Sequence, residues 1–295
     1  MEFNQQSSGL FAAAAGGDTS NVAVAAARQG IPAGYLSAIG QDAGGDALMR
    51  LWAEEGVDTA WVRRDALHPT GVYFVTHGPA GHDFAYYRTG SAASHYASVD
   101  VPEDAVRAAG ILYASGISQG ISASAADAVF HAIGVARAAG VGVAYDTNYR
   151  PRLWPARRAA AVIHAAIAQA NIALPGLDDA MALTGLDDPD AIADFYLRLG
   201  PRVVVLKMGA RGTLLATPDD RERVAPFPCT PVDATGAGDT FGGAFLARLL
   251  LNDSLAAAAR YAACAAALST TGYGAVPPIP HAAAVVQALA EGPPG

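Results

Sequence analysis

Short apolar segments alternate with longer alanine-rich segments from about residue 110 onward, and this alternation constrains the fold more than any other feature of the chain. The apolar segments have the length of strands that are buried on both faces, and the alanine-rich segments have the length of helices. Neighbouring parallel strands need a crossover connection, which a helix usually supplies. The pattern therefore predicts an α/β fold, a doubly wound and mostly parallel sheet with helices on both faces.

The expected elements follow one another closely in the sequence. Gly or Pro residues bound several of them, which is typical of the turns between strands and helices. Strands are expected at residues 111–114, 141–145, 172–174, 203–206 and 213–216. Helices are expected at about 122–139, 155–169, 178–184, 189–199, 239–251 and 254–270.

Residues 70–89 depart from this pattern, because aromatic and β-branched residues alternate around a glycine-rich turn at 77–81. Such alternation around a turn is typical of a β-hairpin. A hairpin cannot join the interior of a parallel sheet, so we expect it to project as a small lid over one edge of the domain. The whole chain, 1–295, is predicted to be a single α/β domain, with the lid contributed by about 1–15 and 68–95.

The charge balance and the cysteines exclude several classes of protein. There are 19 Lys and Arg against 27 Asp and Glu, a net charge of -8, which argues against a nucleic-acid or anionic-membrane partner. Because of this acidic balance, any phosphate site must be built locally, and Lys207, the only lysine, excludes a lysine-rich anion patch. Two cysteines, Cys229 and Cys264, with no clustered His residues, favour neither disulfides nor a structural zinc. With no signal peptide or membrane-spanning segment expected, we expect a cytoplasmic protein.

The sequence T-G-A-G-D at residues 235–239 predicts a site for a phosphoryl group. Small residues let backbone amides approach an anion, and the first amides of a helix lack partners within that helix. An Asp at a helix start is also an ordinary N-cap, and the motif alone leaves that interpretation open. The run contains neither G-x-G-x-x-G nor G-K-[ST], so a dinucleotide fold and a P-loop are disfavoured.

The wider run D-A-T-G-A-G-D-T-F, residues 233–241, resembles the carboxy-terminal signature of the ribokinase-like carbohydrate kinases of the phosphofructokinase-B type and departs from it only at Ala234. The resemblance extends from residue 16 to about 280. Residues 86–94 and 146–154 resemble the 2-keto-3-deoxygluconate kinases of this family in particular. Further landmarks of the family, in the expected order, are residues 16–21, 39–45, 69–71, 183–185 and 207–212.

The resemblance implies ATP-dependent phosphorylation of 2-keto-3-deoxygluconate at its 6-hydroxyl. It implies a sugar acid and ATP as small-molecule partners, Mg²⁺ as the metal, and K⁺ as a further candidate ion. Asp239 would be the general base, and the backbone at Gly236, Ala237 and Gly238 would stabilise the transferring phosphoryl group.

The resemblance also assigns binding residues. Asp179 is the candidate for the metal, whose other ligands would be mostly phosphate and water. The candidates for the sugar are Gly16, Gly17, Asp18, Asn21, Tyr73, Tyr86, Arg88 and Arg150. The candidates for the nucleotide are Asn148, Lys207, Gly209, Gly212, Thr235, Gly236, Ala237 and Gly238.

The spacing of Tyr86 and Arg88 suits the place that the resemblance gives to the sugar. On a strand, residues two apart point to the same face, so the phenol and the guanidinium would reach one ligand together. A guanidinium pairs bidentately with a carboxylate, whereas ribose or fructose offers it much less. This favours an acidic sugar. A surface role for Arg88, and a simple strand-end role for the cation of Lys207, remain as alternatives.

Two departures from the family pattern weigh against full activity. Gly176 stands where the family often has an Asn, so an element that orients Mg²⁺ and phosphate is altered, although Asp179 keeps its acidic group. The family also begins with an apolar strand, of which residues 1–5 would be only the tail. We therefore expect a packing gap in the sheet, and a longer product with an upstream apolar segment should melt at a higher temperature. Equal melting temperatures would count against this expectation.

Other functions remain open at this point. One is a different ribokinase-like sugar kinase, such as a fructokinase. Another is a non-catalytic relative that binds sugar or nucleotide without turnover. The exposed edge of the lid also makes a homo-oligomer through the lid a candidate assembly.

Overall fold

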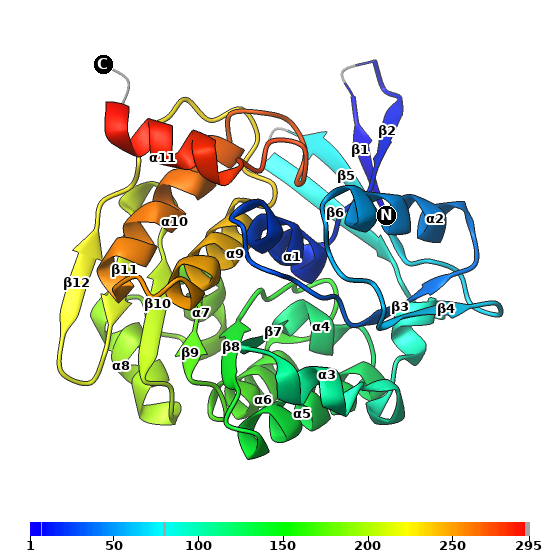
Figure 1. Cartoon of the computed structure of the whole chain (residues 1–295), viewed down its shortest axis with the longest axis horizontal. Helices are drawn as coiled ribbons and strands as arrows, with labels where there is room; N and C mark the ends of the chain where they lie inside the picture. The colour runs from blue at the N-terminus through cyan, green and yellow to red at the C-terminus, as the bar shows by residue number, and fades with distance from the viewer. Residues whose placement is uncertain (7, 79–80, 293–295) are drawn as a thin grey trace.

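The computed structural model describes residues 1–6, 8–78 and 81–292, and its centre is a six-stranded sheet (Figure 1). The strands stand in the order β12-β11-β10-β9-β8-β7. β7 to β10 are parallel to one another, β11 runs antiparallel to β10, and β12 runs antiparallel to β11. The predicted mostly parallel sheet is confirmed, with β7 to β11 within one residue of their expected bounds. The strands are β7 (Ile111–Ser115), β8 (Gly142–Asp146), β9 (Ile172–Ala173), β10 (Val203–Lys207), β11 (Thr213–Ala216) and β12 (Arg221–Val224).

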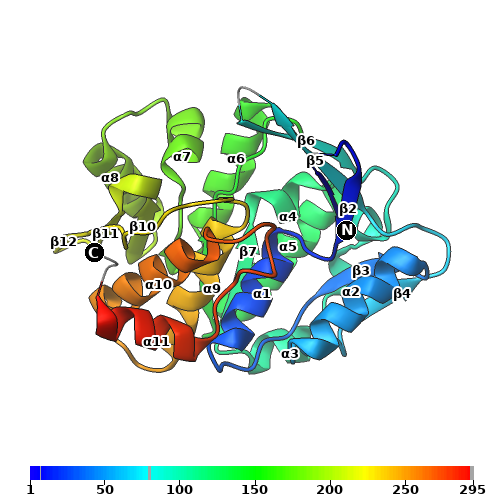
Figure 2. The same cartoon turned by 90° about the horizontal axis from the view of Figure 1, so that it is seen from above.

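Helices cover both faces of this sheet, as predicted (Figures 1 and 2). The side chains of β10 show why: Val204 and Leu206 join the core under one helical layer, whereas Val205 joins the core under the other. The first layer is α5 (Ala123–Ala138), α6 (Ala156–Ile167), α7 (Leu177–Thr184) and α8 (Pro189–Leu199). The second is α9 (Ala237–Leu250) and α10 (Leu255–Ser269), with α1 (Asp18–Arg28) packed beside α9. Helices α5 to α10 lie within two residues of their expected bounds.

Shorter elements complete the body of the molecule. The strands β3 (Ser37–Gly40) and β4 (Val62–Asp65) form a small parallel sheet beside α2 (Ala43–Glu54). The remaining helices are α3 (Glu103–Ala108), α4 (Gly116–Gly120) and α11 (Ala282–Glu291), with 3₁₀ turns at Ala92–His95, Ser98–Asp100 and Gly209–Arg211.

A separate four-stranded sheet forms the lid, in the order β2-β1-β5-β6. Its strands are β1 (Glu2–Gln5), β2 (Phe11–Ala14), β5 (Val72–Gly78) and β6 (Gly81–Tyr87). The hairpin β5–β6 pairs Tyr73 with Tyr86, and β1 runs parallel to β5 on its other side. Pro79 and Ala80 of the expected turn lie outside the described residues. Glu2–Gln5 thus lies in the lid sheet rather than in the central sheet.

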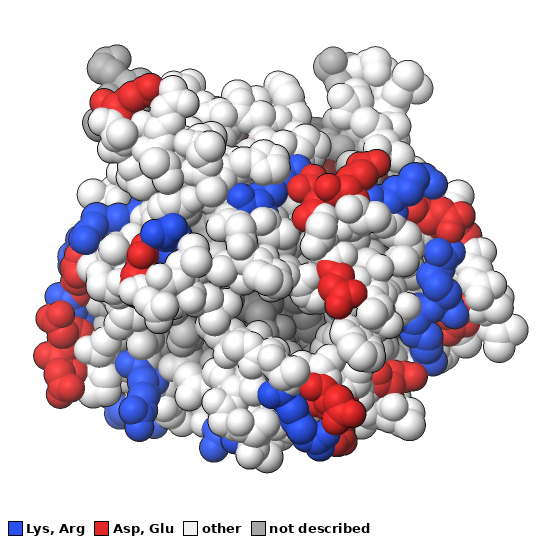
Figure 3. All heavy atoms as spheres, in the orientation of Figure 1, with Lys and Arg blue, Asp and Glu red and all other residues white. Residues whose placement is uncertain are grey.

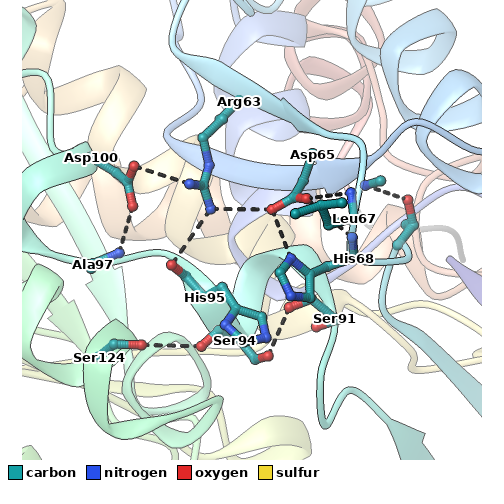
Figure 4. A network of polar contacts seen from close by, with 12 residues as sticks. Arg63, Asp65, Leu67, His68, Ser91, Ser94, His95, Ala97, Asp100 and Ser124 are labelled. Carbon is teal, nitrogen blue, oxygen red and sulfur yellow. Dashed lines mark hydrogen bonds and ion pairs between the residues drawn. The ribbon is translucent and has the colours of Figure 1, made fainter.

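Both ends of the lid hairpin are tied to the body by one polar network (Figure 4). Asp65, at the end of β4, accepts a hydrogen bond from His68 Nδ1 at 3.1 Å, just before the hairpin begins. The ring of His68 stacks on that of His95, just after the hairpin, with 3.8 Å between centroids. Arg63 pairs with Asp65 at 3.6 Å and with Asp100 at 3.3 Å. The hairpin therefore leaves and rejoins the body at adjacent anchored points.

An apolar groove of about 770 Å³ runs along β7, the edge strand of the central sheet. In the described part of the chain, no strand pairs with the outer edge of β7. The lining of the groove comes from α1, α3, α5 and α9 as well as β7, and includes Val22, Tyr35, Ile111, Val129 and Leu246. The face of the molecule drawn in Figure 3 has a hollow near its centre.

The distribution of charged side chains on the surface is relevant to the expected lack of a nucleic-acid or membrane partner. On the face shown in Figure 3, acidic and basic side chains are interspersed rather than gathered by sign. Across residues 1–6, 8–78 and 81–292, none of the helices is both long enough and apolar enough to cross a bilayer.

Candidate active site

A cavity of about 910 Å³ lies between the lid, the carboxyl ends of β8 and β10, and the start of α9. Ligands bind at the carboxyl ends of strands in open α/β sheets, so this is the expected place for a site. Of the residues predicted from the sequence, those that line the cavity are Asp18, Asn21, Tyr73, Tyr86, Arg88, Asn148, Arg150, Asp179, Lys207, Gly209, Gly212, Thr235, Gly236, Ala237, Gly238 and Asp239.

Gly16 and Gly17 are the two predicted sugar residues that are not among the lining residues of the described chain. The Gly17 amide donates to Asn21 Oδ1 at 3.0 Å, and a Cβ on Gly16 would stand 3.3 Å from the same oxygen. Gly17 therefore holds the side chain of Asn21, and Gly16 leaves room beside the same oxygen.

The start of α9 offers backbone amides to the cavity. Gly236 is the N-cap residue with φ of +77°, and a Cβ there would approach the Ala275 carbonyl oxygen to 2.9 Å, so only glycine fits. The Ala237 amide donates to the Ala234 carbonyl at 3.2 Å, within the turn. Thr240 donates to the Gly236 carbonyl, which starts the helical pattern. The amides of Gly238 and Asp239 are therefore better placed than that of Ala237 to receive an anion.

Asp233 organises the loop before α9, and sequence reasoning did not select it. Its carboxylate accepts hydrogen bonds from the amides of Thr235 and Gly274, both at 2.9 Å. Asp233 is only 4% exposed, and through these two hydrogen bonds it joins the loop before α9 to the loop at Gly274. Asp233 is the first residue of the run 233–241, and this position in the signature could have identified it from the sequence.

Asp239 lies in the first turn of α9, but it does not cap the helix. Its Oδ2 accepts a hydrogen bond from Asn21 Nδ2 of α1 at 2.8 Å. The ordinary N-cap interpretation is therefore wrong for this residue. Burial, followed by the charge of Asp18, raises the pKa of Asp239 to about 8, and the hydrogen bond from Asn21 opposes this rise. A base with a pKa near the working pH is well suited to accept a proton in a transition state.

Asp18 lies beside Asp239 at the start of α1. Its carboxylate accepts hydrogen bonds from Ser115 Oγ and Asn148 Nδ2. Burial raises the pKa of Asp18, and the hydrogen bond from Ser115 counteracts it. The structure thus brings Asn148 to a residue predicted for the sugar, although the sequence assigned Asn148 to the nucleotide.

The lid supplies a guanidinium to the other side of the cavity. Arg88 follows β6, and its guanidinium carbon lies 5.2 Å from the ring centroid of Tyr86 and 5.8 Å from that of Tyr73. Tyr87, which stands between Tyr86 and Arg88 in the sequence, is 65% exposed and points outward. Tyr86 and Arg88 therefore share the inner face of the lid, as expected. A surface role for Arg88 is therefore wrong. Glu2 of β1, which the sequence did not single out, accepts the Tyr73 hydroxyl at 2.6 Å and positions that ring.

Arg150 and Asp179 lie together in the cavity wall, and Arg150 also interacts with the lid residue Tyr86. Arg150 Nη1 is 3.9 Å from Asp179 Oδ1, and the Tyr149 amide donates to Asp179 Oδ2 at 3.1 Å. Burial raises the pKa of Asp179 to about 6, against the opposing effect of Arg150. A Cβ on Gly176 would lie 3.5 Å from Asp179 Oδ2, so the missing side chain at Gly176 leaves this carboxylate open to the cavity.

The side chains of the cavity could hold Mg²⁺ only if a bound nucleotide supplied most of the ligands of the ion. Among residues 1–6, 8–78 and 81–292 there is no group of three or more His, Cys, Asp or Glu side chains that would hold a metal by itself. Mg²⁺ commonly takes one or two carboxylates and completes its shell with phosphate and water. The half-buried carboxylate of Asp179 is compatible with that arrangement.

The glycines predicted for the nucleotide line the cavity beyond β10. Gly209 and Gly212 have φ of +56° and +81°. A Cβ on Gly212 would stand 2.2 Å from the Val224 carbonyl oxygen, so this turn requires glycine. Lys207 ends β10, and its side chain is 16% exposed and paired with Asp146, which excludes a freely solvated strand-end cation.

Comparison with known proteins agrees with this geometry. Residues 8–282 match the pfkB family of carbohydrate kinases. The 2-dehydro-3-deoxygluconokinase of Bacillus subtilis (strain 168) is 33% identical to the chain over 240 residues, which are 79% of this chain and 74% of the relative.

Two solved structures are similar over nearly the whole chain. A PfkB protein from Polaromonas sp. JS666 has a TM-score of 0.85 and 33% identity, covering 94% of this chain and 90% of that one. The fructokinase from Vibrio cholerae O395, described in a fructose, ADP and calcium ion bound form, has a TM-score of 0.88 and 25% identity, covering 97% and 94%. The chain therefore belongs to the pfkB family, and it is a carbohydrate kinase with the ribokinase-like α/β fold.

Proposed function

We propose that this kinase transfers the γ-phosphoryl group of ATP to the 6-hydroxyl of 2-keto-3-deoxygluconate. The observation that carries the proposal is that two guanidiniums, of Arg88 and Arg150, line the same cavity as Asp239. A sugar acid offers its carboxylate to these cations, and a neutral sugar does not. The similarity to a 2-dehydro-3-deoxygluconokinase points to the same substrate class.

The residues of the cavity can perform an in-line transfer. Asp239 accepts the proton of the 6-hydroxyl while that oxygen forms a bond to the γ-phosphorus. The bond from the γ-phosphorus to the β,γ-bridging oxygen breaks, and ADP leaves with that oxygen. The amides of Gly238 and Asp239 and the ammonium of Lys207 face the charge that spreads over the transferring group. Gly209, Gly212 and Thr235 line the part of the cavity assigned to the nucleotide.

Mg²⁺ would neutralise the phosphate oxygens of ATP when it is bound. Asp179 is the side chain we assign to it, because its carboxylate is open to the cavity beside Gly176. The Vibrio cholerae fructokinase, which was solved with ADP and a calcium ion, supports a nucleotide with a divalent ion in this fold. K⁺ is retained as a second candidate ion.

A substrate panel tests the proposal. ADP release is measured with 2-keto-3-deoxygluconate and with fructose, for the wild type and for Arg88→Ala. The proposal expects a strong preference for the sugar acid that Arg88→Ala reduces. Preference for fructose, together with indifference to Arg88→Ala, would contradict it and support a fructokinase, the alternative favoured by the similarity to the Vibrio cholerae enzyme.

The non-catalytic alternative is separated by turnover. Binding of the sugar acid and of ATP, without ADP release in excess of background, would establish a binding protein. Asp239 with a raised pKa beside helix-start amides argues for turnover, because neither feature is needed to bind a sugar.

We also propose that the outer face of the lid joins two copies of the chain. Phe74 stacks on Phe3 with centroids 5.1 Å apart and meets Phe11 and Tyr87 edge-on at 5.3 and 5.6 Å. Phe11 and Tyr87 are 41% and 65% exposed, so this aromatic face is open to a partner. Light scattering after size exclusion is expected to show a dimer that Phe11→Ser together with Tyr87→Ser dissociates. A monomeric wild type would exclude it.

The cytoplasm is the compartment we propose, because ATP is available there. Cys229 and Cys264 are free thiols, which is compatible with a reducing environment. Fractionation of the cells that produce the protein checks this assignment.

A further inference from the structure

Asp146, at the end of β8, is a buried carboxylate to which the phosphoryl transfer described above gives no task. It is 2% exposed and lines the cavity at one edge. Its Oδ1 accepts a hydrogen bond from the Asn148 amide at 3.1 Å, and its Oδ2 accepts one from the Tyr113 hydroxyl at 3.3 Å. The same Oδ2 accepts a charge-assisted hydrogen bond from Lys207 Nζ. The carboxylate is thus fixed from three sides.

Lys207 is the only lysine of the chain, and it ends β10, two strands away from β8. A Cβ on Gly238 would stand 3.6 Å from Lys207 Nζ, so the ammonium lies against the start of α9. A lysine side chain has four flexible carbons and keeps a single position only when a partner holds it. Asp146 is that partner.

We propose that Asp146 is a positioning residue that holds the ammonium of Lys207 beside Gly238, where the transferring phosphoryl group arrives. The proposal rests on the proposed kinase function and adds a residue to it. An ammonium has three donors, so Lys207 can keep Asp146 on one N–H and offer the others to phosphate oxygens. The cation is then in place before the nucleotide binds, and no reorganisation is needed at the moment of transfer.

The charges around Asp239 give a second readout. The charged groups that act on it include Asp18 from α1, Asp146 from β8 and Lys207 from β10, and the guanidinium of Arg150, after β8, also interacts with it. The charge of Asp146 contributes to the raised pKa of Asp239. Removing that charge lowers the pKa of Asp239 in the free protein, so the acid limb of the kcat/KM profile should move to lower pH in Asp146→Asn. A purely structural role for Asp146 predicts no such movement.

A double-mutant cycle tests the coupling. Asp146→Asn and Lys207→Met are each expected to lower kcat by about 10- to 100-fold, with the KM for the sugar acid unchanged. Combined, they should lower kcat no further than Lys207→Met alone, because Asp146 acts through Lys207. Additive losses, or full kcat in Asp146→Asn, would overturn the proposal. Asp187→Asn, on an exposed turn, is the matched control and should behave as the wild type.

The single lysine allows a test that does not depend on turnover. Protein labelled with ¹³C-lysine has one Cε–Hε signal, which is followed as Mg²⁺ and a non-hydrolysable ATP analogue are added. In the wild type the signal is expected to shift on addition. In Asp146→Asn the free protein should give a displaced and narrower signal, because the ammonium is released. Identical signals in the two free proteins would overturn the proposal.

A stability check and a second variant separate a failure to fold from a failure of the proposal. Removing one member of a buried ion pair destabilises a protein, so unfolding of Asp146→Asn is checked by its melting temperature. If that variant does not fold, Asp146→Glu takes its place; it should lower kcat in the wild-type background and leave it unchanged in the K207M background. A wild type without turnover would defeat the proposed function, whereas the lysine signal would still decide whether Asp146 holds Lys207.

Discussion

The two ends of the cavity are built from opposite charges and are held in different ways. Under the lid, the guanidinium of Arg88 rests on the faces of Tyr73 and Tyr86. At the start of α9, Asp18 and Asp239 meet across α1 and α9 and are fixed by direct hydrogen bonds. A guanidinium stays charged at all working pH values, whereas crowded carboxylates have raised pKa values. Substrate selection should therefore lie at the lid end, and pH dependence at the carboxylate end.

Asp239→Asn breaks the carboxylate end and should have the largest effect. Loss of the general base is expected to lower kcat by about a thousandfold. Sugar and ATP should still bind, because the arginines and the amides of α9 are untouched. Initial rates and calorimetric titration measure the two properties separately. Turnover equal to that of the wild type would remove Asp239 from the role of base.

Arg88→Ala breaks the lid end. A lost charge-assisted contact to the substrate carboxylate should lower kcat/KM for the sugar acid by about 10- to 100-fold. The rate with fructose should not change, and the acid limb of the pH profile should stay where it is. Arg107→Ala, on exposed α3, is the control. An equal loss with both sugars would mean that Arg88 does not read the carboxylate.

The pH dependence sharpens the contrast. Asp239 must be ionised to accept a proton, and its pKa is about 8 in the free protein, so kcat/KM should rise with pH up to about 8. Below that value the rate should fall about tenfold per pH unit. Arg88→Ala should retain this profile. A rate that is flat from pH 5 to 9 would show that no group with a raised pKa limits the reaction.

The raised pKa of Asp239 should also make the stability of the folded protein depend on pH. The pKa of Asp239 is raised from 3.8 to about 8 on folding. Folded Asp239 therefore keeps its proton where the unfolded chain has lost it, and stability falls as pH rises between these two values. Asp239→Asn removes this loss, so its melting temperature should exceed that of the wild type by more at pH 8 than at pH 4. A constant difference would contradict the raised pKa.

Two glycines of the turn should separate folding from catalysis, with the smallest effects. Gly236→Ala is expected to cost about 1–2 kcal/mol of stability from its left-handed backbone alone, and its Cβ would stand 2.9 Å from the Ala275 carbonyl. Gly238→Ala meets only Lys207 Nζ at 3.6 Å, so it should leave the melting temperature unchanged and lower kcat. Melting curves and initial rates that show the reverse order would contradict this division.

The sequence predicted the body of the fold well because its signals are local. Apolar runs bounded by Gly or Pro gave β7 to β11, and alanine-rich periodicity gave α5 to α10. The edge strand β12 was missed because its residues, Arg221–Val224, are mostly polar and exposed. The motif 235–239 found the start of α9, since its glycines and its acid are contiguous in the chain.

The contacts that organise the site were not predictable in the same way. Asn21 bonds Asp239 across 218 residues, and Asp146 meets Lys207 across 61. Such pairs depend on which strands and helices become neighbours, and no local pattern records that. The raised pKa of Asp239 has the same origin, because its burial, and after it the charge of Asp18, come from the packing of distant segments such as α1 on α9.

A crystal structure with a non-hydrolysable ATP analogue and 2-keto-3-deoxygluconate tests the central claim most directly. We expect the terminal phosphate to accept hydrogen bonds from the amides of Gly238 and Asp239 at about 2.7–3.2 Å. The 6-hydroxyl of the sugar should lie within hydrogen-bond distance of the Asp239 carboxylate, with the sugar carboxylate on Arg88 or Arg150. A terminal phosphate bound elsewhere, or a start of α9 closed off by side chains, would contradict the account.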